Sequence, residues 1–232
     1  MLPPTTNDEH PLAERFRDFV RAADFPCVGA KSALARGQMR IVIARDIRSA
    51  WDDLRIYPGI LDLARSYAED PVLFQTFIVI FEQDDGLSET SFEAALWARL
   101  QSLTDKDAMF AQAPDLSVSR DPDDPHFSLS FGGQAFFVVG LHPGASRPAR
   151  RFERPAMVFN LHDQFVRLRE EGRYEKLRAS ILDRDVAVAG SLNPMLARHG
   201  EMSEARQYSG RAVGNDWQCP FDSRPLGERD AA

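Results

Sequence analysis

Residues 127–141 read FSLSFGGQAFFVVGL, two apolar runs on either side of a pair of glycines. Paired glycines favour a tight turn, because they adopt positive φ angles without steric cost. The stretch therefore predicts a β-hairpin with strands at 127–131 and 135–141. Because a hairpin joins strands that run in opposite directions, it favours an antiparallel sheet.

Other segments of the chain predict the remaining strands and the helices of the domain. Three short apolar runs predict strands, at 40–44, 74–81 and 156–161. Apolar residues recur with helical spacing in five segments: 12–23, 48–67, the stretch after Ser88, 163–171 and 174–189. The order of elements predicts an α+β fold in a single domain, a mainly antiparallel sheet of about five strands with helices packed on one face. We expect the domain to span residues 12–221, with 1–11 and 222–232 as loose termini.

Composition excludes several classes of protein. The 232 residues include 28 basic and 35 acidic ones, a net charge of −7, which disfavours a general nucleic-acid-binding surface. The longest apolar runs are too short to span a bilayer and no signal peptide is visible, so we expect a cytoplasmic protein with no membrane partner. Two cysteines do not make a disulfide framework.

His142 is the first candidate for a ligand, because it directly follows the apolar run 135–141. A histidine at the end of a strand is held rigidly, as metal ligands need to be. Arg147, Arg150 and Arg151 follow within the same loop, where their guanidinium groups are placed to converge on an anion. The alternative interpretation is a polar loop with solvated arginines.

Three further residues carry ligand chemistry. His162 lies between the predicted strand 156–161 and the helix that follows, so it suits a ligand, an acid or base, or a neighbour of the helix cap. Cys27 and Cys219 each stand beside a proline. A thiolate binds haem iron or soft metals, but a lone buried cysteine is more often a small hydrophobic residue. The chain lacks the sequence signatures of serine hydrolases, P-loop proteins and dinucleotide-binding proteins.

Seven motifs resemble the YqcI/YcgG family, and they run in order through nearly the whole chain. They are FPCVGAK from 25, FSLSFGG from 127, HPGASRPARRF from 142, FNLHDQF from 159, NPML from 193, SEARQYSGR from 203 and WQCPF from 217. Family members with known roles are haem-dependent enzymes that oxygenate nitrogen, including N-hydroxylases of guanitoxin and D-cycloserine biosynthesis. The resemblance therefore implies haem b and N-hydroxylation of a small amine or guanidine compound, arginine-like in its chemistry.

The resemblance also implies roles for individual residues. An axial ligand to the iron is expected from His142 first, His162 second, and Cys27 or Cys219 third. The cations expected to bind the cofactor with its two propionates are Arg147, Arg150, Arg151 and Arg211. The residues expected to act on the substrate are Ser146, Gln207 and Tyr208.

The expected co-reactants are molecular oxygen with an electron donor, or peroxide. A homodimer is one possible assembly of the chain. Two other functions compete with N-hydroxylation. In the first, haem serves sensing, transport or peroxide chemistry alone; in the second, a non-haem iron is held by His142, His162 and a carboxylate such as Asp163. A binding module without metal is the last alternative. The adjacent side chains of His162 and Asp163 point to different sides of a helix, which weakens the non-haem hypothesis.

Overall fold

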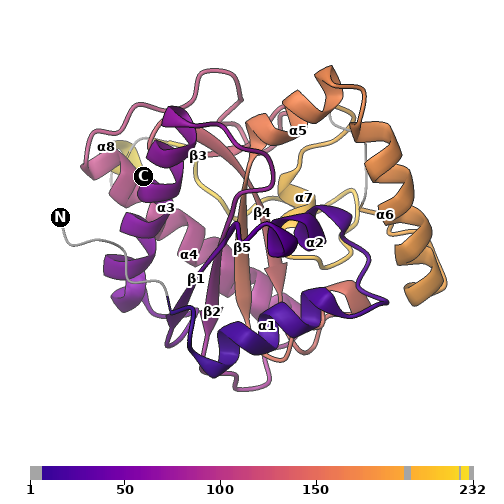
Figure 1. The fold of residues 1–232 in the computed structure, drawn as a ribbon. Coiled ribbons are helices and arrows are strands. Elements are labelled where there is room, and N and C mark those ends of the chain that lie inside the picture. The colour runs from indigo at the N-terminus through magenta and orange to yellow at the C-terminus, as the bar shows by residue number, and fades with distance from the viewer. Residues whose placement is uncertain (1–6, 196–199, 225, 230–232) are drawn as a thin grey trace.

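A five-stranded sheet forms the centre of the computed structural model, which describes residues 7–195, 200–224 and 226–229 (Figure 1). In spatial order the strands are β1 (Met39–Ala44), β2 (Thr76–Phe81), β5 (Ala156–Leu161), β4 (Gln134–Leu141) and β3 (Leu129–Phe131). Only β1 and β2 pair in parallel; the other three neighbouring pairs are antiparallel. The predicted α+β class, with a mainly antiparallel sheet in one domain, is confirmed.

The glycine pair turns the chain between β3 and β4 as predicted. Gly132 and Gly133 have φ angles of 57° and 78°, values that favour glycine. Phe131 then pairs with Gln134 across a two-residue turn. The strand β3 is shorter than predicted, because Phe127 makes only an isolated bridge with Ser119.

Helices cover both faces of the sheet, so the expectation of one covered face was wrong. The helices and short 3-10 turns are α1 (Pro11–Arg21), α2 (Val28–Ala35), η1 (Ala50–Asp52), α3 (Asp53–Glu69), α4 (Glu89–Met109), η2 (Pro148–Arg150), α5 (His162–Glu170), α6 (Tyr174–Ala189), α7 (Ala205–Tyr208) and α8 (Leu226–Arg229). Strand side chains alternate between faces, so Val79 joins an apolar cluster with α3 and α4 while Ile78 joins a second cluster with α1. Figure 1 shows α1 and α2 in front of the strands and α4 behind them.

The segments next to the termini contact the domain where the structure describes them. Asn7 donates its backbone N–H to Ile41 O at 2.8 Å and accepts from Ile43 N at 3.0 Å, so it extends the edge of β1. Near the other end, Asp222 N donates to Gln101 Oε1 at 2.9 Å. These contacts differ from the expected loose termini; residues 1–6, 225 and 230–232 lie outside the described ranges. No helix in those ranges is long and apolar enough to cross a membrane.

The packing of α4 against β4 leads to a stability prediction at Gly140. A Cβ atom at Gly140 would lie 2.8 Å from both Leu96 Cδ1 and Phe92 Cε1, and 2.9 Å from Tyr208 O. Gly140→Ala should therefore lower the free energy of unfolding by about 1–3 kcal/mol, since overpacking forces neighbours to move. Chemical denaturation measures the difference.

Gly29→Ala is the matched control, because the added methyl group would meet only ordinary contacts at 3.8 and 3.9 Å. Alanine is also favoured over glycine inside a helix such as α2, so this variant should be unchanged or slightly more stable. Equal stability of Gly140→Ala and the parent chain would contradict the close packing of α4 on β4.

Candidate functional site

The two candidate histidines lie at opposite ends of the sheet. Leu141, just before His142, pairs with Ala156 at the start of β5, whereas His162 directly follows Leu161 at its end. Five residues of extended strand separate these ends, which corresponds to about 17 Å. One ion cannot bind both side chains, so the non-haem hypothesis using His142, His162 and Asp163 was wrong.

Asp163 is engaged elsewhere, as expected from its position next to His162 on a helix. Its Oδ2 accepts a hydrogen bond of 2.7 Å from Tyr67 Oη. Within the described ranges, no group of three or more histidine, cysteine or acidic side chains is placed to hold a metal ion. The geometry therefore offers no metal site made of protein ligands alone in this part of the chain.

His142 is buried on the α4 side of the sheet, with an exposed fraction of 1%. Its ring stacks on Phe92 with centroids 4.3 Å apart, and its backbone N–H donates to Arg150 O at 3.0 Å. Its Nδ1 has no hydrogen-bond partner among the described residues. Burial lowers the pKa of His142, because desolvation disfavours the charged imidazolium. The ring is held rigidly, as the sequence suggested, and burial keeps it neutral, but it packs against a phenylalanine.

Arg150 binds the protein rather than an open anion site. Its guanidinium donates to three backbone carbonyls: Gly140 O at 2.9 Å, Gln207 O at 3.0 Å and Tyr208 O at 3.3 Å. Gly140 lies where β4 extends beyond β3, so Arg150 satisfies the free edge of that strand and attaches α7 to it. Burial lowers the pKa of Arg150 to about 10.

The other predicted cofactor-binding arginines also have protein acceptors. Arg147 pairs with Asp185 of α6 and donates to Ser191 O at 3.0 Å. Arg151 donates to Ala145 O at 2.6 Å and Ser146 O at 2.8 Å.

Arg211 binds Glu93 of α4 through Nε at 2.9 Å, and Ser209 Oγ donates to the same carboxylate at 2.9 Å. The expected convergence of the loop arginines on one anion is therefore not the arrangement in this structure.

The three residues expected to act on a substrate are not brought together by direct contacts. Ser146 is exposed, and its backbone N–H donates to Glu89 Oε1 at 2.9 Å. Gln207 contributes its carbonyl to Arg150. Tyr208 is fully buried, donates from Oη to Phe136 O at 3.1 Å and stacks on Trp97 with centroids 5.5 Å apart. Burial raises the pKa of Tyr208, so the phenol stays protonated.

The two cysteines are free thiols in different surroundings. Cys27 caps the start of α2, where its Sγ accepts from Ala30 N at 3.4 Å, and it interacts electrostatically with Arg150. Cys219 packs against the apolar cluster of α3 and α4. Burial raises the pKa of both thiols, that of Cys219 to about 12. Both are therefore protonated at neutral pH, which does not favour a thiolate ligand in this state.

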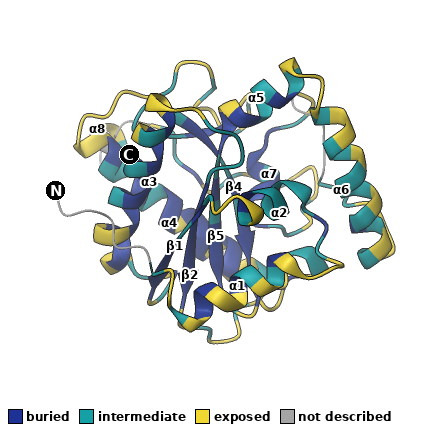
Figure 2. Cartoon of the chain, in the orientation of Figure 1, coloured by how far each residue is buried: buried dark blue, intermediate teal, exposed yellow. Residues whose placement is uncertain are grey.

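A half-buried patch lies in the middle of the sheet on the face opposite α4. We name it the central patch: Phe137 and Val139 of β4, with Asn160 and Val158 opposite them on β5. The remaining residues from 135 to 141 and from 156 to 161 are buried. Helix α6 contacts α2, α5 and η2, and α5 contacts β4 and β5, so these elements surround the patch. Figure 2 shows α6 mostly intermediate or exposed beside a buried sheet.

His162 borders the central patch. It is the first residue of α5, is buried, and its Nε2 lies 3.8 Å from Glu204 Oε1. Phe165, one helical turn later, meets Phe137 edge to face with centroids 6.2 Å apart. Tyr208 contacts the other side of Phe137 at 5.4 Å. Phe137 and Phe165 were not predicted as site residues, although the spacing of 162 and 165 places those side chains on one face of a helix.

The family model described as the YqcI/YcgG family matches residues 16–222. The chain belongs to the YqcI/YcgG family. No curated protein and no solved structure matches the chain.

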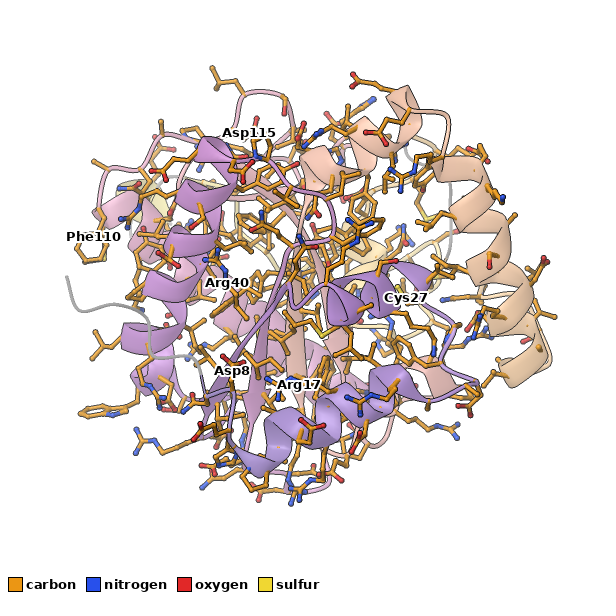
Figure 3. The ribbon with its side chains drawn as sticks, viewed as in Figure 1. Asp8, Arg17, Cys27, Arg40, Phe110 and Asp115 are labelled. Carbon is orange, nitrogen blue, oxygen red and sulfur yellow. The ribbon has the colours of Figure 1, made fainter. Side chains whose placement is uncertain are left out.

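Four motifs of this YqcI/YcgG protein, far apart in the sequence, meet around Arg150 and the central patch. Arg150 binds carbonyls of β4 and α7 and lies close to Cys27, whose position at the start of α2 is labelled in Figure 3. His162 reaches Glu204, which directly precedes α7. Residues of four of the seven motifs therefore form one neighbourhood, with His142 on the other face of the sheet.

The lowered pKa of His142 predicts a loss of stability in mild acid. The unfolded chain takes up a proton as the pH falls below 6.5, while the buried imidazole resists it. The free energy of unfolding should therefore fall, by up to about 1.4 kcal/mol per pH unit from this group, as the pH drops below 6.5.

His142→Gln, which carries no titrating ring, should show a shallower fall in denaturation experiments from pH 7.5 to 5.5. His126→Gln is the comparison variant, since it removes an exposed imidazole, 65% of whose side chain is accessible, in place of the buried one. An unchanged slope in His142→Gln would contradict a neutral, buried His142.

Proposed function

We propose that this chain binds haem b against the central patch through an imidazole ligand and N-hydroxylates a small amine or guanidine compound. The reaction would use molecular oxygen with an electron donor, or peroxide. Membership of the YqcI/YcgG family supports the chemistry, as the sequence resemblance implied. The position proposed for the haem rests on one observation: the buried His162–Glu204 pair lies beside a partly accessible apolar surface of the sheet.

The residues around the central patch fit a porphyrin and its iron. Phe137, Val139 and Val158 offer an apolar platform for a flat ring. His162 supplies the donor nitrogen, and the carboxylate of Glu204 is the kind of partner that orients an iron-binding histidine. Helix α6, which closes the far side, has a single buried residue, Asp185, in its 16 residues. Its other residues are half-buried or exposed, so its displacement would uncover only one fully buried side chain of the helix, which favours entry of a large cofactor.

The face occupied by His142 fits a porphyrin less well. The His142 ring is covered by Phe92, and the arginines of the following loop bind protein acceptors. Among these arginines, Arg147 binds Asp185 of α6 and Ser191 just after it. Displacement of α6 would therefore also free the Arg147 guanidinium to bind a propionate. We therefore rank His162 above His142 as the axial ligand, with Cys27 as the third candidate.

The chain's own groups have defined tasks in this proposal. Haem, when bound, supplies the activation of oxygen or peroxide. His162 would hold the iron, and the Glu204 carboxylate, 3.8 Å from its Nε2, would favour one orientation of the imidazole ring. Tyr208, kept protonated by burial, keeps Phe137 in place from the side of α7. The half-buried apolar residues of the patch would exclude water from the reacting nitrogen.

Absorption spectroscopy after expression with a haem precursor tests the proposal. The parent chain should show a Soret band, and His162→Ala should lose most of it because the iron loses its ligand. His142→Ala is the matched control, since it removes the other buried histidine, and it should keep the band. Incubation with arginine, oxygen and reductant should then give an N-hydroxylated product in the parent chain.

A colourless protein from haem-replete cells would overturn the proposal. Loss of the band in His142→Ala alone would assign the iron ligand to His142, on the opposite face of the sheet. Retention in both variants, with loss in Cys27→Ala, would assign the thiol. A Soret band without conversion of any amine or guanidine would favour haem bound for sensing or peroxide chemistry.

A further inference from the structure

Asp107, near the end of α4, is a buried acid without a counter-ion. Every other buried acid in the described ranges has a basic side chain within ion-pair distance: Asp52 with Arg45, Asp53 with Arg99 and Lys106, Glu93 with Arg211, Asp185 with Arg147, and Glu204 with His162. Asp107 is 5% exposed and has no such partner among those residues. A buried carboxylate without a cation is costly, so it points to a function.

The hydrogen bonds of Asp107 occupy only one of its oxygens. Oδ1 accepts from Tyr57 Oη at 2.9 Å and from the backbone N–H of Gly132 at 3.0 Å. No described residue donates a hydrogen bond to Oδ2. Burial raises the pKa of Asp107, although the two bonds to Oδ1 oppose this effect. A further donor at Oδ2 would complete the set that a buried carboxylate requires.

Asp107 lines a cavity of about 100 Å³ that opens to solvent. This volume has room for about three water molecules. Thr104, also in the lining, has a buried Oγ1 without a hydrogen-bond partner in the described ranges. Ser128 and Ser130 add hydroxyl groups, and the exposed Arg120 contributes to the lining. The lining thus combines these polar groups with apolar side chains, among them Phe127, Leu129 and Phe221.

We infer that this cavity binds the protonated nitrogen of a small organic compound, an alkylammonium or guanidinium group, with Asp107 Oδ2 as its acceptor and Thr104 Oγ1 beside it. A cation supplies both the missing charge and the missing donor, which water or a neutral molecule does not. The site lies on the side of the sheet that carries α4, away from the central patch. The inference does not depend on haem or on the proposed function.

Nuclear magnetic resonance titrations of the ¹⁵N-labelled full chain test this site. The Gly132 amide, which donates to Asp107 Oδ1, is the reporter. Methylammonium and guanidinium chloride, at low millimolar concentrations, should each shift its signal to saturation. Urea has nearly the same shape as guanidinium but no charge, and sodium chloride matches the ionic strength. Neither should give a saturating shift.

Two variants assign the contact. Asp107→Asn keeps an acceptor for Tyr57 and Gly132 but removes the charge, so binding should weaken about tenfold or more. Tyr57→Phe removes a bond to Oδ1 and leaves Oδ2 in place, so binding should persist. A comparison of glycine with methylammonium tests the role of Arg120, because glycine carries a carboxylate as well as an ammonium group. Tighter binding of glycine would indicate that its carboxylate contacts the Arg120 side chain.

Equal saturation by urea and guanidinium would overturn the inference, and this comparison uses only the parent chain. Undiminished binding by a folded Asp107→Asn variant would also overturn it. The readout is the Gly132 signal in protein without haem. A negative titration would therefore not contradict the haem proposal, and a colourless protein would not contradict cation binding in this cavity.

Discussion

The guanidinium of Arg150 holds together the part of the molecule on which the rest of the structure depends. Strand β4 continues well beyond its partner β3, so the carbonyl of Gly140 has no strand to receive it. Arg150 supplies the missing donor and, with the same group, binds two carbonyls of α7. A neutral side chain would leave three buried carbonyls unsatisfied, at a cost of about 1–3 kcal/mol for each. The loop after His142, the free strand edge and α7 are therefore positioned by one residue.

That arrangement explains why the two faces of the sheet differ. On the α4 face, close packing extends from Phe92 through Gly140, and His142 is sealed within it. On the other face, α2, α5 and α6 leave the central patch half-buried. Arg147 and Arg150 come from the same loop, but one reaches out to α6 and the other reaches in to the strand edge. One face of the sheet is thus closely packed, whereas the other keeps half-buried apolar side chains.

Local patterns predicted much of the fold. The glycine pair predicted the hairpin, and the apolar runs predicted all the remaining strands, because these signals depend on a few adjacent residues. Helix α2 was missed, because Cys27 was considered only as a possible ligand beside a proline, whereas it caps the start of this helix. The covering of both faces was missed because it depends on packing between distant segments: α3, which joins the parallel strands β1 and β2, packs with α4 on one face, whereas α1 and α2 pack on the other.

The candidate site was harder to predict, since its geometry depends on distant segments. The sequence indicated a rigidly held His142, but not its burial, and it placed His162 at the junction of strand and helix. It did not indicate that antiparallel pairing separates these two residues by the length of β5. Nor could it show that the loop arginines would find carbonyls and acids contributed by α6 and α7. Asp107 gave no signal, because the missing counter-ion is visible only once every neighbour has been placed.

The weak anchoring of α6 has a consequence for the behaviour of the chain in solution. A helix of 16 residues with one fully buried side chain contributes little to the apolar core, and its polar attachments include the Arg147–Asp185 pair and a hydrogen bond of 2.7 Å from Arg184 to Ala23 O. Its amide protons should exchange with solvent sooner than those of β2 and β5, through openings that leave the sheet intact. Such partial opening would uncover the valine and phenylalanine side chains of the central patch and so expose an apolar surface to neighbouring molecules.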